Sequence, residues 1–175
     1  MSRFEANVLR QPELLAAALE RPAPAWLKPP ARSRKVFFCG VGTNHHAAQI
    51  AAWLWSSKGF DARAVHAHDF VSRPYRLSKG DLGVFLSHRG GSRSYTVRAE
   101  ALARRAGAET VAVCADGAVW KGPRRRLDTC SLEDTGAFTK SFTTTMAWLL
   151  RWAGAPPCSL RSAHPSCPGV RRSPA

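Results

Sequence analysis

Short apolar runs that alternate with helix-length segments limit most strongly what this chain can fold into. Residues 35–39, 81–87 and 110–114 are rich in β-branched and aromatic side chains, and 62–66 and 127–131 are weaker runs of the same kind. Between several of them lie segments with apolar residues at helical spacing. This alternation is typical of βαβ units. The sequence therefore predicts an α/β fold, a three-layer α-β-α sandwich around a mostly parallel five-stranded sheet.

Three of the other segments are expected to be helices that pack on this sheet. In 44–58, Asn44 is in place to cap the first turn and Gly59 to end the helix. A second helix is expected over 94–106 and a third over 138–152. The expected buried faces of the first two are Ala47, Ile50, Ala51 and Leu54, and Tyr95, Ala99, Leu102 and Ala106.

Prolines mark the domain boundaries. Residues 1–34 are expected to form an N-terminal helix over about 4–20, with a first segment that stops at Pro12, followed by a proline-rich linker. Residues 35–152 form the predicted domain. The segment 153–175 holds five prolines and no acidic residue, and we expect a disordered tail there.

The chain is strongly basic, with 26 Lys and Arg against 12 Asp and Glu and a formal net charge of +14. The only tight basic run is Arg124 to Arg126, and no aromatic residue stands within it to stack on bases. We therefore expect a solvated basic surface and no nucleic-acid partner. No stretch approaches 18 consecutive apolar residues, so no membrane partner is expected either.

Five cysteines, an odd number, occur without a secretory segment, which predicts reduced thiols in a cytoplasmic protein. Cys158, His164 and Cys167 could be drawn together as metal ligands, but their spacing fits no standard site. His45, His46, His66 and His68 are read as helix-face or strand-end residues. We expect neither a metal nor another cofactor.

Three turns carry the polar residues that could bind a ligand, since ligands of parallel sheets lie at the carboxyl ends of the strands. Residues 40–44 are too poor in glycine for a dinucleotide site, because His45 stands where a third glycine is needed. Residues 87–92 combine serines and Arg89 ahead of a helix, a pattern that suits an anion. The alternative is that a serine only caps that helix and that Arg89 is solvated. In 133–140, acidic residues before a helix can likewise be simple caps.

Taken together, the three turns resemble the SIS (sugar isomerase) domain family, in particular the isomerase modules of glutamine–fructose-6-phosphate aminotransferases. The family's G-x-G-T-S-x-x-A is here Gly-Val-Gly-Thr-Asn-His-His-Ala at 40–47. Its S-Q-S-G-E-T is Ser-His-Arg-Gly-Gly-Ser at 87–92. Its E-I-G-V-A-S-T-K-A-F is Glu-Asp-Thr-Gly-Ala-Phe-Thr-Lys-Ser-Phe at 133–142. The resemblance covers about 4–152 and implies a flavodoxin-like sheet.

The resemblance also implies a site that binds a phosphosugar, with the phosphate at 87–92 and the sugar at the other two turns. Three residues depart from the family pattern: Arg89, Gly91 and Phe138. The resemblance therefore does not identify which sugar is bound. Carried over position by position, the implied ligand-binding residues are Thr43, Asn44, Ser87, His88, Arg89, Gly90, Ser92, Ala137 and Lys140.

We expect a phosphosugar-binding module that is a fragment or relative of an amino-sugar isomerase or aminotransferase and forms a homo-oligomer. The aminotransferases that the turns resemble carry two such modules and a glutaminase domain, and the second module and the glutaminase domain have no counterpart in this sequence. The composition of residues 153–175 suggests out-of-frame coding sequence joined to a truncated module. One alternative is an active single-module isomerase in which His88 or Glu133 is the base. Another is a sugar-phosphate-sensing regulator, although about 34 residues before the first strand are too few for a helix-turn-helix domain.

Overall fold

A single parallel sheet organises the computed structural model, which describes residues 2–73, 75 and 77–154. Its strand order is β2-β1-β3-β4-β5, and every neighbouring pair is parallel. This is the flavodoxin-like order, and it confirms the predicted fold class. The strands are β1 (Lys35–Gly40), β2 (Asp61–His66), β3 (Leu82–Leu86), β4 (Glu109–Asp116) and β5 (Arg125–Ser131).

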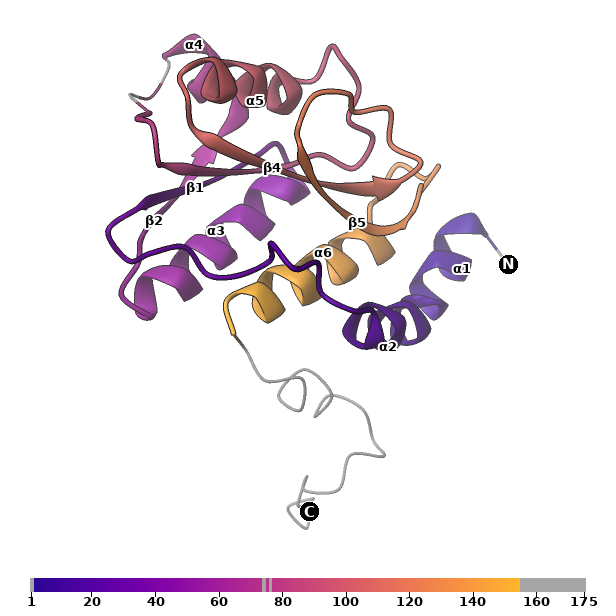
Figure 1. Cartoon of the computed structure of the whole chain (residues 1–175). Helices are drawn as coiled ribbons and strands as arrows, with labels where there is room; N and C mark the ends of the chain where they lie inside the picture. Colours follow the sequence, from indigo (N-terminus) through magenta and orange to yellow (C-terminus); the bar gives the residue numbers. More distant parts are fainter. Residues whose placement is uncertain (1, 74, 76, 155–175) are drawn as a thin grey trace, which may run out of the picture.

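Helices cover both faces of the sheet (Figure 1). One face carries α2 (Gln11–Glu20), α3 (Thr43–Ser57) and α6 (Lys140–Trp152), and the other carries α4 (Ala67–Ser72) and α5 (Tyr95–Arg105). The short helix α1 (Arg3–Leu9) precedes α2. Successive residues of β1 serve opposite faces, since Val36 and Phe38 join the core under α3 and α6 while Phe37 and Cys39 join the core under α4 and α5.

Several sequence predictions about the helices are wrong in detail. The segment expected over 4–20 does divide into two helices, but the first ends at Leu9 and not at Pro12. Pro12 lies in the first turn of α2, where its missing N–H has no intrahelical partner to lose. Asn44 does not cap α3, because the helix begins at Thr43 with Gly42 as the N-cap residue. The short helix α4 was not predicted at all. Residues 155–175, most of the predicted tail, lie outside the described residues, so the domain boundaries stay a prediction.

The predicted buried faces are also rotated on both helices. Ile50 is exposed, and α3 buries Ala48, Ala52 and Trp55 along with Ala47 and Ala51. On α5 the buried residues are Thr96, Ala99, Glu100 and Ala103, so Tyr95 and Ala106 were wrong. The buried faces of α3 and α5 consist mainly of alanines. The prediction gave more weight to the larger side chains of Ile50 and Tyr95, and both are exposed. None of the helices in the described part of the chain is long and apolar enough to cross a membrane.

Trp55 and Trp148 are the largest fully buried side chains among the described residues, and Trp55 ties α3 to the sheet and to α6. Its ring centroid lies 5.6 Å from that of Phe38, 5.0 Å from that of Phe60 and 5.4 Å from that of Trp152. Edge-to-face aromatic contacts of this kind add to the free energy of burial.

We expect Trp55→Ala to lower the free energy of unfolding by about 3–5 kcal/mol, because it leaves a cavity between three aromatic rings. Trp53→Ala is the matched control, since Trp53 lies two residues away and is 71% exposed. Its effect is expected to stay within about 0.5 kcal/mol. Urea denaturation of dilute protein measures both values, and equal losses would contradict the packing described here.

Candidate functional site

Two of the three polar turns, those after β1 and β3, start side by side where the direction of the chain across the sheet changes. Strands β1 and β3 are neighbours, with Cys39 paired to Phe85, so the turns that follow them start side by side. The turn after β1 enters α3 on one face, and the turn after β3 enters α5 on the other (Figure 1). Ligands of open parallel sheets bind at such a switch point.

The first turn brings the start of α3 unusually close to the end of β1. A Cβ atom on Gly40 would lie 2.8 Å from the backbone carbonyl of Asn44, so a side chain there would collide with the helix. Gly42 has a φ of +56° and is followed by Thr43, which is exposed, and Asn44, which is half-buried. No side chain caps α3, although the N–H of Asn44 donates to the carbonyl of Val41 (3.2 Å) and that of His45 to the carbonyl of Gly42 (2.8 Å).

The second turn is shaped by its own hydroxyl and by glycine. The N–H of Gly90 donates to Ser87 Oγ (3.3 Å), and Gly90 has a φ of +59°. A Cβ at Gly90 would lie 2.5 Å from Trp120 Cβ. Ser92 is exposed, and Ser94 occupies the N-cap position of α5 without a side-chain capping bond. The alternative in which Ser94 caps α5 is therefore not found, and the N-terminus of α5 also has no side-chain cap.

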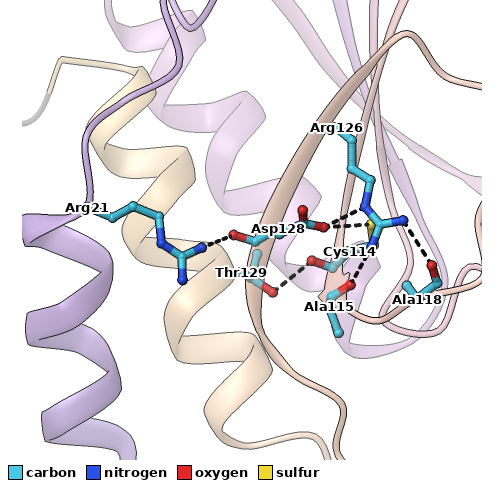
Figure 2. A network of polar contacts seen from close by, with 7 residues as sticks. All are labelled: Arg21, Cys114, Ala115, Ala118, Arg126, Asp128 and Thr129. Atoms are coloured by element: carbon cyan, nitrogen blue, oxygen red, sulfur yellow. Dashed lines mark hydrogen bonds and ion pairs between the residues drawn. The ribbon is translucent and has the colours of Figure 1, made fainter.

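The connection 117–124 between β4 and β5 supports this second turn. The N–H of Val119 donates to the carbonyl of Arg89 (3.2 Å), and Trp120 packs against Gly90. Arg126 holds the start of the connection in place, because its guanidinium donates to the carbonyls of Ala115 (3.0 Å) and Ala118 (2.9 Å) (Figure 2).

Arg126 is held in turn by Asp128, whose carboxylate accepts from its Nε (Figure 2). The main-chain carbonyl of Asp128 accepts from Arg21 (2.9 Å), and Thr129 Oγ1 donates to the carbonyl of Cys114 (3.1 Å). Arg125 pairs with Glu109. Two arginines of the basic run, Arg125 and Arg126, thus make contacts within the fold.

The third turn buries a carboxylate at the N-terminus of α6. Glu133 is 1% exposed. Its Oε1 accepts from the N–H groups of Thr139 (2.9 Å) and Lys140 (3.3 Å), and its Oε2 accepts from the N–H of Ser141 (3.0 Å). Burial alone would raise the pKa of this carboxyl, but the hydrogen bonds from Ser141 and Thr139 outweigh it and lower the pKa. The acidic residue is therefore a cap, as the simpler interpretation of the sequence had it.

His88 joins the second turn to the third. The N–H of Glu133 donates to His88 Nε2 (2.7 Å), and the imidazole lies 4.8 Å from the ring of Phe138. Burial lowers the pKa of His88 despite the nearby Glu133 carboxylate. A neutral ring that accepts at Nε2 carries its proton on Nδ1, which is buried without a partner among the described residues. Arg89 adds a second link by donating to the carbonyl of Glu133 (3.3 Å).

The structure thus joins the second and third turns directly, whereas no hydrogen bond within the described residues connects the first turn to either. Lys140 is buried, and its Nζ donates to Ser131 Oγ (3.1 Å). Ala137 is exposed, and its carbonyl accepts from Thr135. The link through His88 and Phe138 was missed, and the only signal for it was that Phe138 departs from the family pattern.

Other features lie apart from these turns. A hollow of about 650 Å³ adjoins α4 and contains none of the predicted ligand-binding residues in its lining, which is formed by His68, Asp69, Ser72, Arg73 and Tyr75. No group of three His, Cys, Asp or Glu side chains in the described part of the chain is placed to hold a metal. Cys158, His164 and Cys167 lie outside the described residues.

Comparison with known proteins gives one family and a set of similar folds. The family model described as SIS domain matches residues 31–151. No curated protein matches the chain. Among solved structures, tagatose-6-phosphate ketose/aldose isomerase from Escherichia coli is 22% identical with a TM-score of 0.64 and matches 86% of this chain and 47% of its own.

Two further solved structures are similar at the level of the fold. Glucosamine-6-phosphate deaminase from Thermotoga maritima has a TM-score of 0.72 at 17% identity, over 89% of this chain and 50% of its own. The C-terminal domain of glucosamine-fructose-6-phosphate aminotransferase from Francisella tularensis has a TM-score of 0.66 at 16% identity, over 88% and 47%. The chain therefore spans about half the length of these relatives.

The bond at His88 predicts a dependence of stability on pH. Because burial lowers the pKa of His88 in the folded chain, the unfolded chain takes up the proton first. Stability is then complete above the ordinary histidine pKa of about 6.5 and falls as the pH drops below it. His88→Gln keeps an acceptor for the Glu133 N–H but does not titrate.

We expect His88→Gln to lose less unfolding free energy than the parent chain between pH 7 and 5. Urea titrations at several pH values measure this difference. Some slope will remain, since burial also lowers the pKa of His45. Identical slopes in the two proteins would show that His88 takes up its proton as readily in the folded chain as in the unfolded chain, so that burial does not lower its pKa.

Proposed function

Because the chain belongs to the SIS domain family, we propose that it binds a phosphosugar at the carboxyl ends of β1 and β3. One observation carries the proposal. Four helices begin at this edge, and α4 is the shortest, with six residues. Of the three longer ones, α6 has its N-terminus occupied by Glu133, while α3 and α5 have no side-chain cap. The edge therefore keeps two positive helix ends for an anion and closes the third.

The second turn is the proposed phosphate site. It offers the first N–H groups of α5, the hydroxyl of Ser92, which no described residue binds, and the guanidinium of Arg89. The guanidinium of Arg89 makes one hydrogen bond among the described residues, to the carbonyl of Glu133, so it has further N–H groups for a phosphate. Ser87 already accepts a bond from Gly90, and its own hydroxyl proton is available to a ligand.

The sugar is proposed to lie toward the first turn, against Thr43 and Asn44, whose hydroxyl and amide suit sugar hydroxyl groups. Ala137 and Lys140 of the third turn are the remaining proposed contacts. Each of the three similar structures is named for a hexose 6-phosphate or its amino derivative. We propose the same class of ligand here, in the metabolism of carbohydrate derivatives.

Binding without turnover is the activity that we propose for this chain. An isomerase needs a base that can reach the substrate. Glu133, one candidate, is saturated with donors, and His88, the other, already accepts a bond at Nε2 and is buried at Nδ1. The alternative of an active single-module isomerase therefore has less support than binding alone. Conversion of fructose 6-phosphate by the purified chain would favour the isomerase instead.

The proposal extends to the setting of the protein. We propose a cytoplasmic protein that forms a homo-oligomer and has no nucleic-acid partner. In support, three cysteines are free and buried: Cys39, Cys114 and Cys130. Burial raises the pKa of Cys39 and of Cys114 to about 12, so these thiols stay protonated and unreactive. Free thiols of this kind suit a reducing compartment. Arg125 and Arg126 are engaged within the fold and do not form a basic patch.

Glucose 6-phosphate and fructose 6-phosphate are expected to raise the melting temperature, whereas glucose and fructose are not. At ten times the dissociation constant a ligand stabilises the folded chain by about 1.4 kcal/mol. Ser92→Ala is expected to weaken binding roughly ten- to a hundredfold, because a hydrogen bond to a charged group contributes about 1.5–3 kcal/mol. Arg89→Ala is expected to weaken it at least as much.

Arg105→Ala is the control for the loss of charge, since it removes an arginine from the opposite end of α5. Its affinity should equal that of the parent chain in isothermal titration. Equal stabilisation by glucose and glucose 6-phosphate would exclude a phosphate site. Unchanged affinity in both Ser92→Ala and Arg89→Ala would remove the site from the second turn.

A further inference from the structure

The first two helices carry three polar side chains that reach the third turn or the first turns of α6. Arg3 and Asn7 lie on α1, Gln11 is the first residue of α2, and each is four residues from the next. Arg3 pairs with the carboxylate of Asp134, and Asn7 Nδ2 donates to Thr135 Oγ1 (3.4 Å). Gln11 Oε1 accepts from a threonine of α6 (2.5 Å). We call Arg3, Asn7 and Gln11 the N-terminal clamp.

Burial distinguishes Asn7 from the other contact that α1 makes with the third turn. Arg3 and Asp134 are both exposed, and an exposed ion pair contributes little to stability. Asn7, by contrast, is only 9% exposed, although it lies on a helix of seven residues. A buried amide is costly unless it is hydrogen-bonded, so the bond to Thr135 is the one that α1 depends on.

The bond from Asn7 continues through Thr135 to the main chain of the third turn. Thr135 Oγ1 donates to the carbonyl of Ala137 (2.8 Å), which uses its single proton. The hydroxyl can then only accept from Asn7, and the Asn7 amide meets it with Nδ2, the donor. Ala137, whose carbonyl is held in this way, has an N–H without a partner among the described residues.

We propose that Asn7 is a positioning residue of the phosphosugar site, which holds the third turn through Thr135 so that the N–H of Ala137 can donate to a sugar hydroxyl. The proposal rests on the function proposed above, and it adds to the site a segment that precedes the family match, which begins at residue 31.

The clamp and the second turn hold the third turn from different sides. The second turn contacts it through His88 and Arg89, which bind the main chain of Glu133. No hydrogen bond or ion pair of the N-terminal clamp within the described residues reaches the second turn, where the phosphate is proposed to bind. Loss of the clamp should therefore weaken binding of the sugar and leave binding of the phosphate as it is.

Amide hydrogen exchange of the full chain without ligand tests whether Asn7 holds the turn. Asn7→Asp places a carboxylate that can only accept, so it takes the proton of Thr135 away from Ala137. Thr135→Val removes the hydroxyl with little change of shape, and Thr135→Ser keeps it. Exchange over residues 134–139 is expected to be faster in Asn7→Asp and Thr135→Val and unchanged in Thr135→Ser. Leu9→Ala is the matched control on α1, because Leu9 is 69% exposed.

Isothermal titration with glucose 6-phosphate and with inorganic phosphate then separates the sugar from the phosphate. Asn7→Asp and Thr135→Val are expected to bind glucose 6-phosphate roughly two- to tenfold more weakly, the contribution of one neutral hydrogen bond. Their affinity for inorganic phosphate should equal that of the parent chain, and Thr135→Ser should restore both affinities. A residue that only supports the fold would weaken both ligands alike.

Unchanged exchange in both Asn7→Asp and Thr135→Val would overturn the proposal, and so would an equal loss of affinity for the two ligands. A parent chain that binds neither ligand would overturn the proposed function. The exchange rates would in that case still decide whether Asn7 holds the third turn, because they are measured without a ligand.

Discussion

The buried carboxylate of Glu133 is the interaction on which the candidate site depends. An ionised carboxyl group inside a protein is costly unless donors replace its water, and here three N–H groups and two hydroxyls at the start of α6 do so. The same residue holds the second turn through its main chain, by its N–H to His88 and its carbonyl to Arg89. One acidic residue thus fixes α6 and sets the distance between two loops.

The cap that Glu133 forms on α6 also determines where positive charge remains at this edge of the sheet. With the N-terminus of α6 neutralised, the positive ends of α3 and α5 remain at the point where β1 and β3 separate. Arg89 stands beside the second of these ends with most of its donors unused. The proposed preference for an anion therefore rests on the backbone and on one negative charge placed elsewhere, more than on a cluster of basic side chains.

The sequence was most informative where one physical cause dominates. Strand β1 is buried on both faces, so its residues had to be uniformly apolar, and the three turns could be matched in register to a family. Prediction was poorer where the cause is distant or shared. Alanines define the buried face of α3, so Ile50 was misplaced. The cap of α6 comes from a residue six positions earlier, and the bond from Glu133 to His88 joins residues 45 apart, which no local pattern reveals.

The connection between β4 and β5 is short for two parallel strands, which usually need a dozen or more residues. Residues 117–124 must return the chain from Asp116 to Arg125, which pairs with Val111, about 17 Å back along β4. Eight residues reach at most about 26–29 Å, and part of that length is used to bring Trp120 against Gly90. The connection has little slack, so a deletion would draw Trp120 away from the second turn. The shape of that turn is therefore set in part by the length of a segment that includes none of the proposed ligand contacts.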